Sequence, residues 1–102
     1  MIIHTVAFKT KHENDSEEEN NFLKAGIALG NLPMVKNFQC YKQISKKSEF
    51  EFGFSMEFNS EQEYDAYNNH PDHKNFVETR WKPEIEAFTE IDYVKYRVTW
   101  QE

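Results

Sequence analysis

Apolar residues at every second position between residues 50 and 58 are the feature that most constrains the fold of this chain. The alternating apolar residues are Phe50, Phe52, Phe54, Met56 and Phe58. Successive side chains of a β-strand point to opposite faces of a sheet, so this spacing predicts a strand. One face of that strand is strongly apolar, and the other, with glutamates, a glycine and a serine, is mixed.

A second strand is predicted at the start of the chain, over residues 1–9. One predicted face carries Ile2, His4, Val6 and Phe8, and the other carries Ile3, Thr5 and Ala7. Both faces are largely apolar, so we expect both to be covered.

Two further strands are predicted at residues 35–44 and 91–100. In the first of these, Phe38 and Cys40 are in phase. In the last strand the apolar phase changes between Tyr93 and Val94. Such a change predicts a bulge, or a strand that leaves one sheet for another surface.

Paired capping residues predict where the helices begin. Ser16 is followed by Glu19, and Ser60 by Glu63, which is the spacing of a capping box. Asp15 with Glu18 offers the same pairing one residue earlier.

Glycine and proline predict where the helices end. Gly30-Asn31 ends the first helix. Pro71 ends the second helix at a non-helical His70, which could cap the helix that begins at Pro71. Pro83 is expected to bend or end that last helix.

The predicted order is strand, helix, strand, strand, helix pair, strand. This order is typical of an α+β, ferredoxin-like βαββαβ protomer with a four-stranded antiparallel sheet and helices on one face. The other face would expose Ile3, Ala7 and part of the last strand. An exposed apolar sheet face predicts a partner, and the simplest is a second copy, which gives a homodimer through the sheet face.

Charge and cysteine content exclude several classes of partner and setting. The net charge is −6 and no basic stripe is present, so we expect neither nucleic acid nor an anionic membrane as a partner. Cys40 is the only cysteine, and we expect it half-buried in a strand rather than reactive. One cysteine, no signal peptide and no membrane span predict a reduced, cytoplasmic setting.

Reactive side chains are concentrated between residues 67 and 73, where Tyr67, His70 and His73 follow one another. A neutral imidazole can accept a proton near pH 7, and a phenol can donate a hydrogen bond to a developing oxyanion. With His4, this group predicts a pocket between helices and sheet.

The residues named above resemble the stress-responsive α/β-barrel (Dabb) domain family over residues 1–95. The resemblance rests on His4, on residues 66–73 and on Ile91-Asp92-Tyr93. It implies a protomer that dimerises through its sheet into a dimeric α+β barrel. Residues 96–102 would form a C-terminal extension that could continue the last strand.

The resemblance also implies site residues. In a plant polyketide cyclase of this family, the catalytic tyrosine and histidine match Tyr67 and His73. We therefore expect Tyr67 and His73 to be catalytic if the chain is an enzyme with cyclase-like chemistry. The residues expected to bind a small, partly aromatic substrate are His4, Val6, Phe8, Phe22 and Trp81.

Three alternatives stay open at this stage. The chain could be a non-catalytic, stress-related structural homodimer, in which case Phe22, Phe54, Phe58 and Trp81 would fill the pocket. The histidines could be structural, or His70 and His73 with Asp72 could hold a metal. We predict neither metal nor cofactor, because no H-E-x-x-H and no phosphate-binding glycine loop is present.

Overall fold

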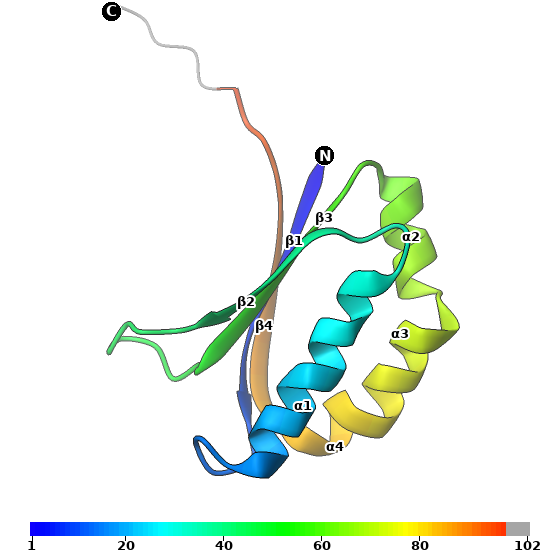
Figure 1. Ribbon diagram of the computed structural model, residues 1–102. Helices are drawn as coiled ribbons and strands as arrows, with labels where there is room; N and C mark the ends of the chain where they lie inside the picture. The colour runs from blue at the N-terminus through cyan, green and yellow to red at the C-terminus, as the bar shows by residue number, and fades with distance from the viewer. Residues whose placement is uncertain (98–102) are drawn as a thin grey trace, which may run out of the picture.

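The computed structural model describes residues 1–97 and shows one antiparallel sheet with helices packed against one face (Figure 1). The strand order in the sheet is β2-β3-β1-β4. The elements in chain order are β1 (Ile2–Thr10), α1 (Glu17–Ile27), η1 (Ala28–Asn31), β2 (Lys36–Lys42), β3 (Phe52–Phe58), α2 (Glu61–Asn68), α3 (Pro71–Phe76), η2 (Val77–Trp81), α4 (Lys82–Glu84) and β4 (Ile85–Val94). The predicted ferredoxin-like βαββαβ protomer is confirmed.

The register of the central strands decides which side chains face the helices. In the β1–β3 pair, His4 lies opposite Met56 and Val6 opposite Phe54. Directly opposed residues of two strands share a face, so the even-numbered residues of both strands point toward the helices. The β1–β4 pair continues this pattern, with Asp92 opposite His4.

The serine caps lie where the sequence predicts them. The hydroxyl of Ser16 accepts a hydrogen bond from the Glu19 backbone N–H at 3.2 Å, and Ser60 accepts from Glu63 at the same distance. The two glutamates reach back to the residue before each cap, Asp15 and Asn59. These bonds satisfy N–H groups that the first helical turn leaves without partners.

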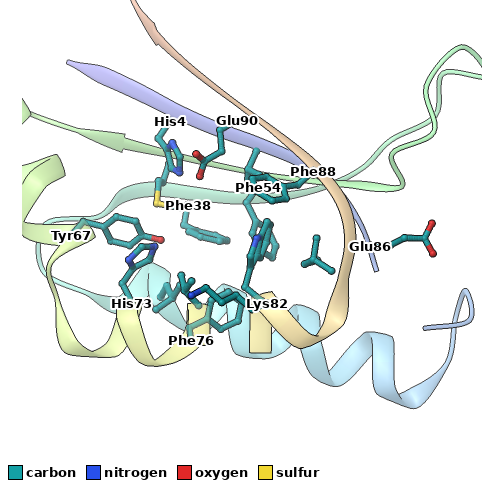
Figure 2. Close-up of a pocket in the computed structure, with 16 residues that line it drawn as sticks. His4, Phe38, Phe54, Tyr67, His73, Phe76, Lys82, Glu86, Phe88 and Glu90 are labelled. Carbon is teal, nitrogen blue, oxygen red and sulfur yellow. The ribbon is translucent and has the colours of Figure 1, made fainter. Parts of the chain in front are cut away.

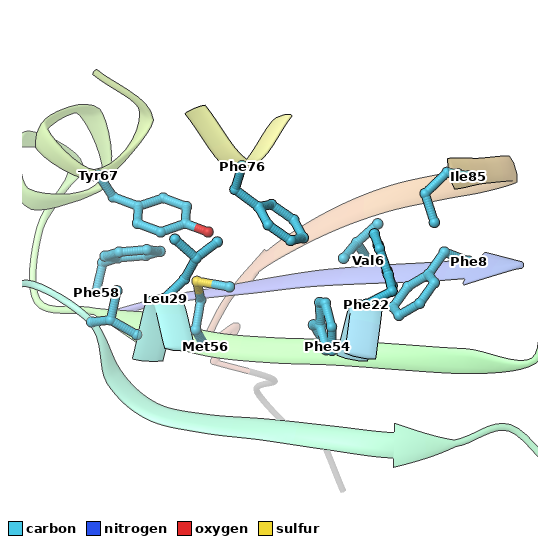
Figure 3. Packing of buried hydrophobic residues seen from close by; sticks show 11 residues of the cluster. Val6, Phe8, Phe22, Leu29, Phe54, Met56, Phe58, Tyr67, Phe76 and Ile85 are labelled. Carbon is cyan, nitrogen blue, oxygen red and sulfur yellow. The ribbon is translucent and has the colours of Figure 1, made fainter. Parts of the chain in front are cut away.

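Helix α1 approaches the sheet closely because residue 26 is a glycine. A Cβ atom at Gly26 would lie 2.6 Å from the ring of Phe54. The missing side chain lets this ring pack directly beneath the helix. Phe54 therefore has one edge against α1 and lies in the apolar layer between helix and sheet (Figure 3).

The helical segment after β3 is broken at His70 and contains a π-helical turn between α3 and α4. His70 is extended and caps α3, because its Nδ1 accepts from the Asp72 backbone N–H at 3.1 Å. Pro71 occupies the first turn of α3, as predicted. Residues Val77–Trp81 then form η2, a π-helical turn, and α4 ends at Glu84, just after Pro83.

The last strand differs most from the prediction. It begins at Ile85 rather than at residue 91 and ends at Val94. Residues 95–97 are not in a strand, and the rest of the predicted extension, including Val98 and Trp100, lies outside the described residues. The β1–β4 register shifts between Lys9 and Thr10. The irregularity is therefore near the start of β4, and no bulge lies between Tyr93 and Val94. The other predicted possibility, a strand that leaves the sheet for another surface, concerns the chain beyond Val94 and stays a prediction.

Two strands are shorter than predicted. The second strand is Lys36–Lys42 instead of residues 35–44, and its pairing with β3 is interrupted between Lys36 and Gln39. Asn37, with a positive φ, lies in this interruption. The third strand begins at Phe52 instead of Phe50. In the gap, the Gln43 backbone N–H donates to the Glu51 carbonyl at 2.9 Å, and the Gln43 side chain donates to the Phe50 carbonyl.

The core lies between the helices and the sheet and is rich in phenylalanine (Figure 3). Its buried residues are Val6, Phe8, Phe22, Leu29, Val35, Phe54, Met56, Phe58, Tyr67, Phe76 and Ile85. Cys40, expected to be half-buried, is exposed. Its neighbour across the sheet is Phe54, but the helices do not extend over this part of β2 (Figure 1).

The opposite side of the sheet, the open face, carries no helix (Figure 1). Ile3, Tyr93 and Ile91 lie there on adjacent strands, with 38%, 51% and 46% of their surfaces exposed. Tyr41 on β2 is also exposed. The predicted uncovered apolar face is present. Among the helices of residues 1–97, none has the length and apolarity needed to cross a membrane.

Candidate functional site

A cavity of about 480 Å³ lies between the helices and the sheet (Figure 2). Most of its wall is apolar, and both the strands of the sheet and the helical segments contribute side chains to it. One end is polar, with His4, Tyr67, His73 and Glu90. The remaining lining residues are Val6, Leu29, Phe38, Phe54, Met56, Phe76, Val77, Trp81, Lys82, Ile85, Glu86 and Phe88.

Tyr67 and His73 face each other at the polar end. Tyr67 comes from the last turn of α2 and His73 from the first turn of α3, and the break at Pro71 turns the two helices toward one another. Their ring centroids are 4.3 Å apart, with the planes tilted by 43°. Figure 2 shows the two rings next to each other at one end of the cavity.

The hydroxyl of Tyr67 has no hydrogen-bond partner among the described residues, although only 3% of the residue surface is exposed. It lies beside His73 at the cavity (Figure 2). Burial raises the pKa of Tyr67, and the charge of Glu90 raises it further. The phenol is therefore protonated at neutral pH and available to donate to a bound molecule.

His73 is held as a neutral base. Burial lowers the pKa of His73, an effect that the hydrogen bond to Asn68 partly opposes. Its Nδ1 donates to the Asn68 carbonyl at 3.3 Å. In a neutral imidazole with Nδ1 protonated, Nε2 is an acceptor. The site therefore combines a neutral proton acceptor with a neutral hydrogen-bond donor.

His4 is oriented by Asp92 and Tyr64. Oδ1 of Asp92 accepts from Nδ1 of His4 at 2.5 Å, and Oδ2 accepts from the Tyr64 hydroxyl at 2.8 Å. Burial raises the pKa of Tyr64, and the hydrogen bond to Asp92 raises it further. With Nδ1 bonded to Asp92, the remaining ring nitrogen of His4 is left for the cavity that this residue lines.

The structure brings together five of the seven predicted site residues. His4, Val6, Tyr67, His73 and Trp81 line the cavity.

The other two predicted site residues, Phe8 and Phe22, are fully buried and do not line the cavity. Their rings pack against the indole of Trp81, with centroids 5.3 and 6.1 Å away. They support the wall from behind.

Sequence reasoning missed Glu90, Asp92 and Tyr64. The first two lie on the helix-facing side of β4, at alternate positions. The signal is the polar alternation of these two residues. Starting the predicted strand at residue 91 left Glu90 outside it, and Asp92 was named only as part of the family resemblance. Tyr64 lies one turn before Tyr67 on α2, and helical spacing alone does not distinguish it from a core residue.

A metal site does not form from the predicted residues. Nδ1 of His70 accepts from the Asp72 backbone, and His73 faces the Asn68 carbonyl instead. Within residues 1–97, no three histidine, cysteine or acidic side chains lie close enough to hold a metal ion.

Solved structures with the same fold were found for almost the whole chain. A Dabb family protein with a ferredoxin-like fold from Mesorhizobium loti is 48% identical, with a TM-score of 0.91 over 94% of this chain and 97% of that chain. A dimeric ferredoxin-like protein of unknown function from Thermobifida fusca is 18% identical, with a TM-score of 0.75 over 92% and 90% of the two chains.

A hydroxynitrile lyase from Passiflora edulis shares the fold at 15% identity, with a TM-score of 0.81 over 96% and 95% of the two chains. A comparison with curated proteins found no match.

A family model described as the stress responsive A/B barrel domain, Dabb, matches residues 2–95. This match covers all the strands and helices described above and every residue of the cavity wall. The chain therefore belongs to the Dabb family.

Proposed function

We propose that this protein binds a small, partly aromatic molecule in the cavity and moves a proton on it. The observation that supports the proposal most strongly is the pairing of Tyr67 and His73 at one end of an open, apolar cavity. The Tyr67 side chain is largely buried, and its unpaired hydroxyl lies at the cavity surface. A phenol in this position, beside a neutral imidazole, is suited to donate a hydrogen bond to a molecule that enters the cavity.

The chemistry that fits these two groups is proton abstraction next to a carbonyl. Nε2 of His73 takes a proton from the carbon beside the carbonyl, and the electron pair moves to the carbonyl oxygen. The Tyr67 hydroxyl then donates to that oxygen and stabilises the enolate. An enolate that attacks a second carbonyl in the same molecule closes a ring, the cyclase-like reaction that the sequence resemblance implies.

A purely structural role is less well supported. That role required phenylalanines and Trp81 to fill the pocket, but Phe22 and Phe58 are packed in the core outside the cavity wall. The space in front of His73 is open. A protein without a ligand would gain stability by filling such a space.

Hydrogen–deuterium exchange on an aromatic ketone tests the proposed chemistry directly. The methyl protons of 2-acetylnaphthalene lie next to its carbonyl, and NMR in D₂O follows their loss. The protein should accelerate this exchange, His73→Gln should return it to the buffer rate, and Tyr67→Phe should slow it by about 100-fold, as for an oxyanion-hole donor.

His70→Asn is the matched control, because His70 does not line the cavity and asparagine also caps helices. This variant should exchange the ketone protons like the unaltered protein. Exchange that is as fast in His73→Gln as in the unaltered protein would contradict the proposal.

We also propose that a second copy covers the open face. Ile3, Ile91 and Tyr93 form an apolar group there on adjacent strands, and covering such a group against an identical one is favourable. The similar Thermobifida fusca structure is dimeric, which supports the same assembly here.

Analytical ultracentrifugation tests this assembly. Ile91→Glu should convert dimer to monomer, because it places a charge in the apolar group. Ile44→Glu is the control, since Ile44 is exposed in the loop between β2 and β3. A dimer that survives Ile91→Glu would count against sheet-to-sheet pairing.

A further inference from the structure

Glu90 is a cavity residue that the proposed proton transfer does not use. It lies opposite Val6 in the β1–β4 pair, so its side chain is on the helix-facing side of the sheet. It lines the cavity near His4 (Figure 2). No hydrogen bond or ion pair within residues 1–97 involves the side chain of Glu90.

The positive charges around the cavity are already paired with other acids. Nζ of Lys82, at the cavity rim, lies 2.5 Å from Glu78. Nζ of Lys9, across the sheet, lies 3.5 Å from Glu86.

Arg80 is likewise paired, with its guanidinium bonded to Glu84. None of these three cations is paired with Glu90.

The histidines at the polar end do not balance the charge either. The Nδ1 atom of His4 is bonded to Asp92, which is itself a carboxylate. The pKa of His73 is lowered by burial, so its imidazole is neutral at neutral pH. The phenol of Tyr67 is also neutral. The polar end therefore carries an unbalanced negative charge.

An apolar cavity wall with an unpaired carboxylate at one end fits one kind of ligand: an apolar body with a positively charged group at one end. Phe54, Trp81 and Phe88 line the cavity together with Glu90. Their rings can pack against the aromatic body of a ligand whose positively charged head reaches Glu90. Glu90 attracts a positively charged head and repels a carboxylate head, which would gain no partner there.

We propose that Glu90 makes the cavity selective for aromatic molecules that carry an amine, over those that carry a carboxylate. This inference rests on the proposed function, because it uses the same cavity. It narrows the substrate class to aromatic carbonyl compounds with a positively charged amino group. Glu90 is then a specificity residue, and Tyr67 and His73 act on the carbonyl.

Three probes with one aromatic body and different heads test the selectivity. They are 2-(1-naphthyl)ethylamine, 2-(1-naphthyl)ethanol and 1-naphthaleneacetate, each titrated into the protein at pH 7.5 and followed by NMR at Tyr67, His73 and Trp81. The amine should bind most tightly and the acetate least. The affinity for the amine should exceed the affinity for the alcohol by only about fivefold, because Glu90 is open to water and the attraction is screened.

Glu90→Gln should remove the preference for the amine and strengthen binding of the acetate, with the alcohol unchanged. Glu86→Gln is the matched control: it also removes one carboxylate from a residue of the cavity wall, but this carboxylate is paired with Lys9 and points away from the other lining side chains (Figure 2). Its order of affinities should equal that of the unaltered protein. Raising the salt concentration should reduce the amine preference of the unaltered protein.

The outcomes separate this inference from the proposed function. Equal affinity for the three heads, or an amine preference that survives Glu90→Gln, would overturn the selectivity while leaving the cavity as a ligand site. If none of the probes moved the resonances of Tyr67, His73 and Trp81, ligand binding in the cavity would itself be contradicted. The alcohol titration in Glu90→Gln also shows whether the variant keeps a folded cavity.

Discussion

Asp92 on the edge strand holds His4 on the neighbouring strand, with 2.5 Å between Oδ1 of Asp92 and Nδ1 of His4. The imidazole is 7% exposed and the carboxylate 43% exposed, so the bond anchors a buried ring from a partly exposed position. Tyr64 donates to the same carboxylate. The three side chains form one unit, and their contributions to stability should not be independent.

A double-mutant cycle measures this dependence. Asp92→Ala should lower the free energy of unfolding by about 1–2 kcal/mol, because the buried imidazole loses its partner. Tyr64→Phe should cost about 1 kcal/mol, and the double variant should lose less than the sum of the two. Urea unfolding at one protein concentration gives the values, and strictly additive losses would show that the unit does not exist.

Tyr67→Phe should leave stability unchanged within about 0.5 kcal/mol, because the hydroxyl has no partner to lose. Tyr67→Ala should cost about 3–5 kcal/mol, as for loss of a large core ring. Thermal and urea unfolding of the two variants separate the ring from its hydroxyl. A large loss in Tyr67→Phe would reveal an internal partner for the phenol and weaken its assignment to an external one.

Gly26→Ala should reshape the cavity. The new methyl group would meet the Phe54 ring, and the ring lines the cavity, so it can move into that space. Overpacking costs about 1–3 kcal/mol, and alanine in a helix recovers about 1 kcal/mol relative to glycine. The expected result is a small loss of stability with weaker binding of naphthyl probes.

Gly53→Ala is the control for this change, because a methyl group there meets only the Val6 carbonyl at 3.6 Å. Gly53 lies on the open face, away from the cavity. Probe binding should be unchanged in this variant. If Gly26→Ala bound the probes as tightly as the unaltered protein, Phe54 would not be a movable part of the wall.

Stability should fall below neutral pH partly because of His73. Its pKa is lower in the folded protein than in the unfolded chain, so the unfolded chain takes up the proton first. The contribution of His73 is therefore complete above the unfolded pKa of about 6.5 and is lost as the pH falls through the lower, folded pKa. Between pH 7.5 and 5.5, the unaltered protein should lose more stability than His73→Gln.

Urea unfolding of both proteins at the two pH values checks this difference. The other histidines are present in both, so their contributions cancel. Parallel loss of stability in the two proteins would mean that burial does not disfavour a charged His73.

Local chemistry explains what could be predicted from the sequence. The caps at Ser16 and Ser60 and the break at His70-Pro71 depend on residues a few positions apart, and all three occur as predicted. The alternation around Phe54 and Met56 depends only on the period of a strand. These features gave the order of the elements, and the order implied the fold.

The rest depends on contacts between distant parts of the chain. His4 and Asp92 are 88 residues apart, and only the pairing of β1 with β4 brings them together. Periodicity assigned His4 to a face but could not name its neighbour. The same limit applies to Phe8 and Phe22, which share the apolar character of the wall but lie behind Trp81.

The π-helical turn η2 determines where in this helical segment a residue can be removed without turning the side chains that follow. A π-turn contains one residue more than an α-turn. When that extra residue is removed, an α-turn remains, and the side chains before and after it keep their directions. Removing exposed Thr79 would convert the turn to regular α-helix and leave Phe76 and Trp81 aimed at the same place. One residue removed from the regular turns of α3 would instead rotate every later side chain by about 100°. We therefore expect the deletion of one residue to be better tolerated in η2 than in the regular turns of α3.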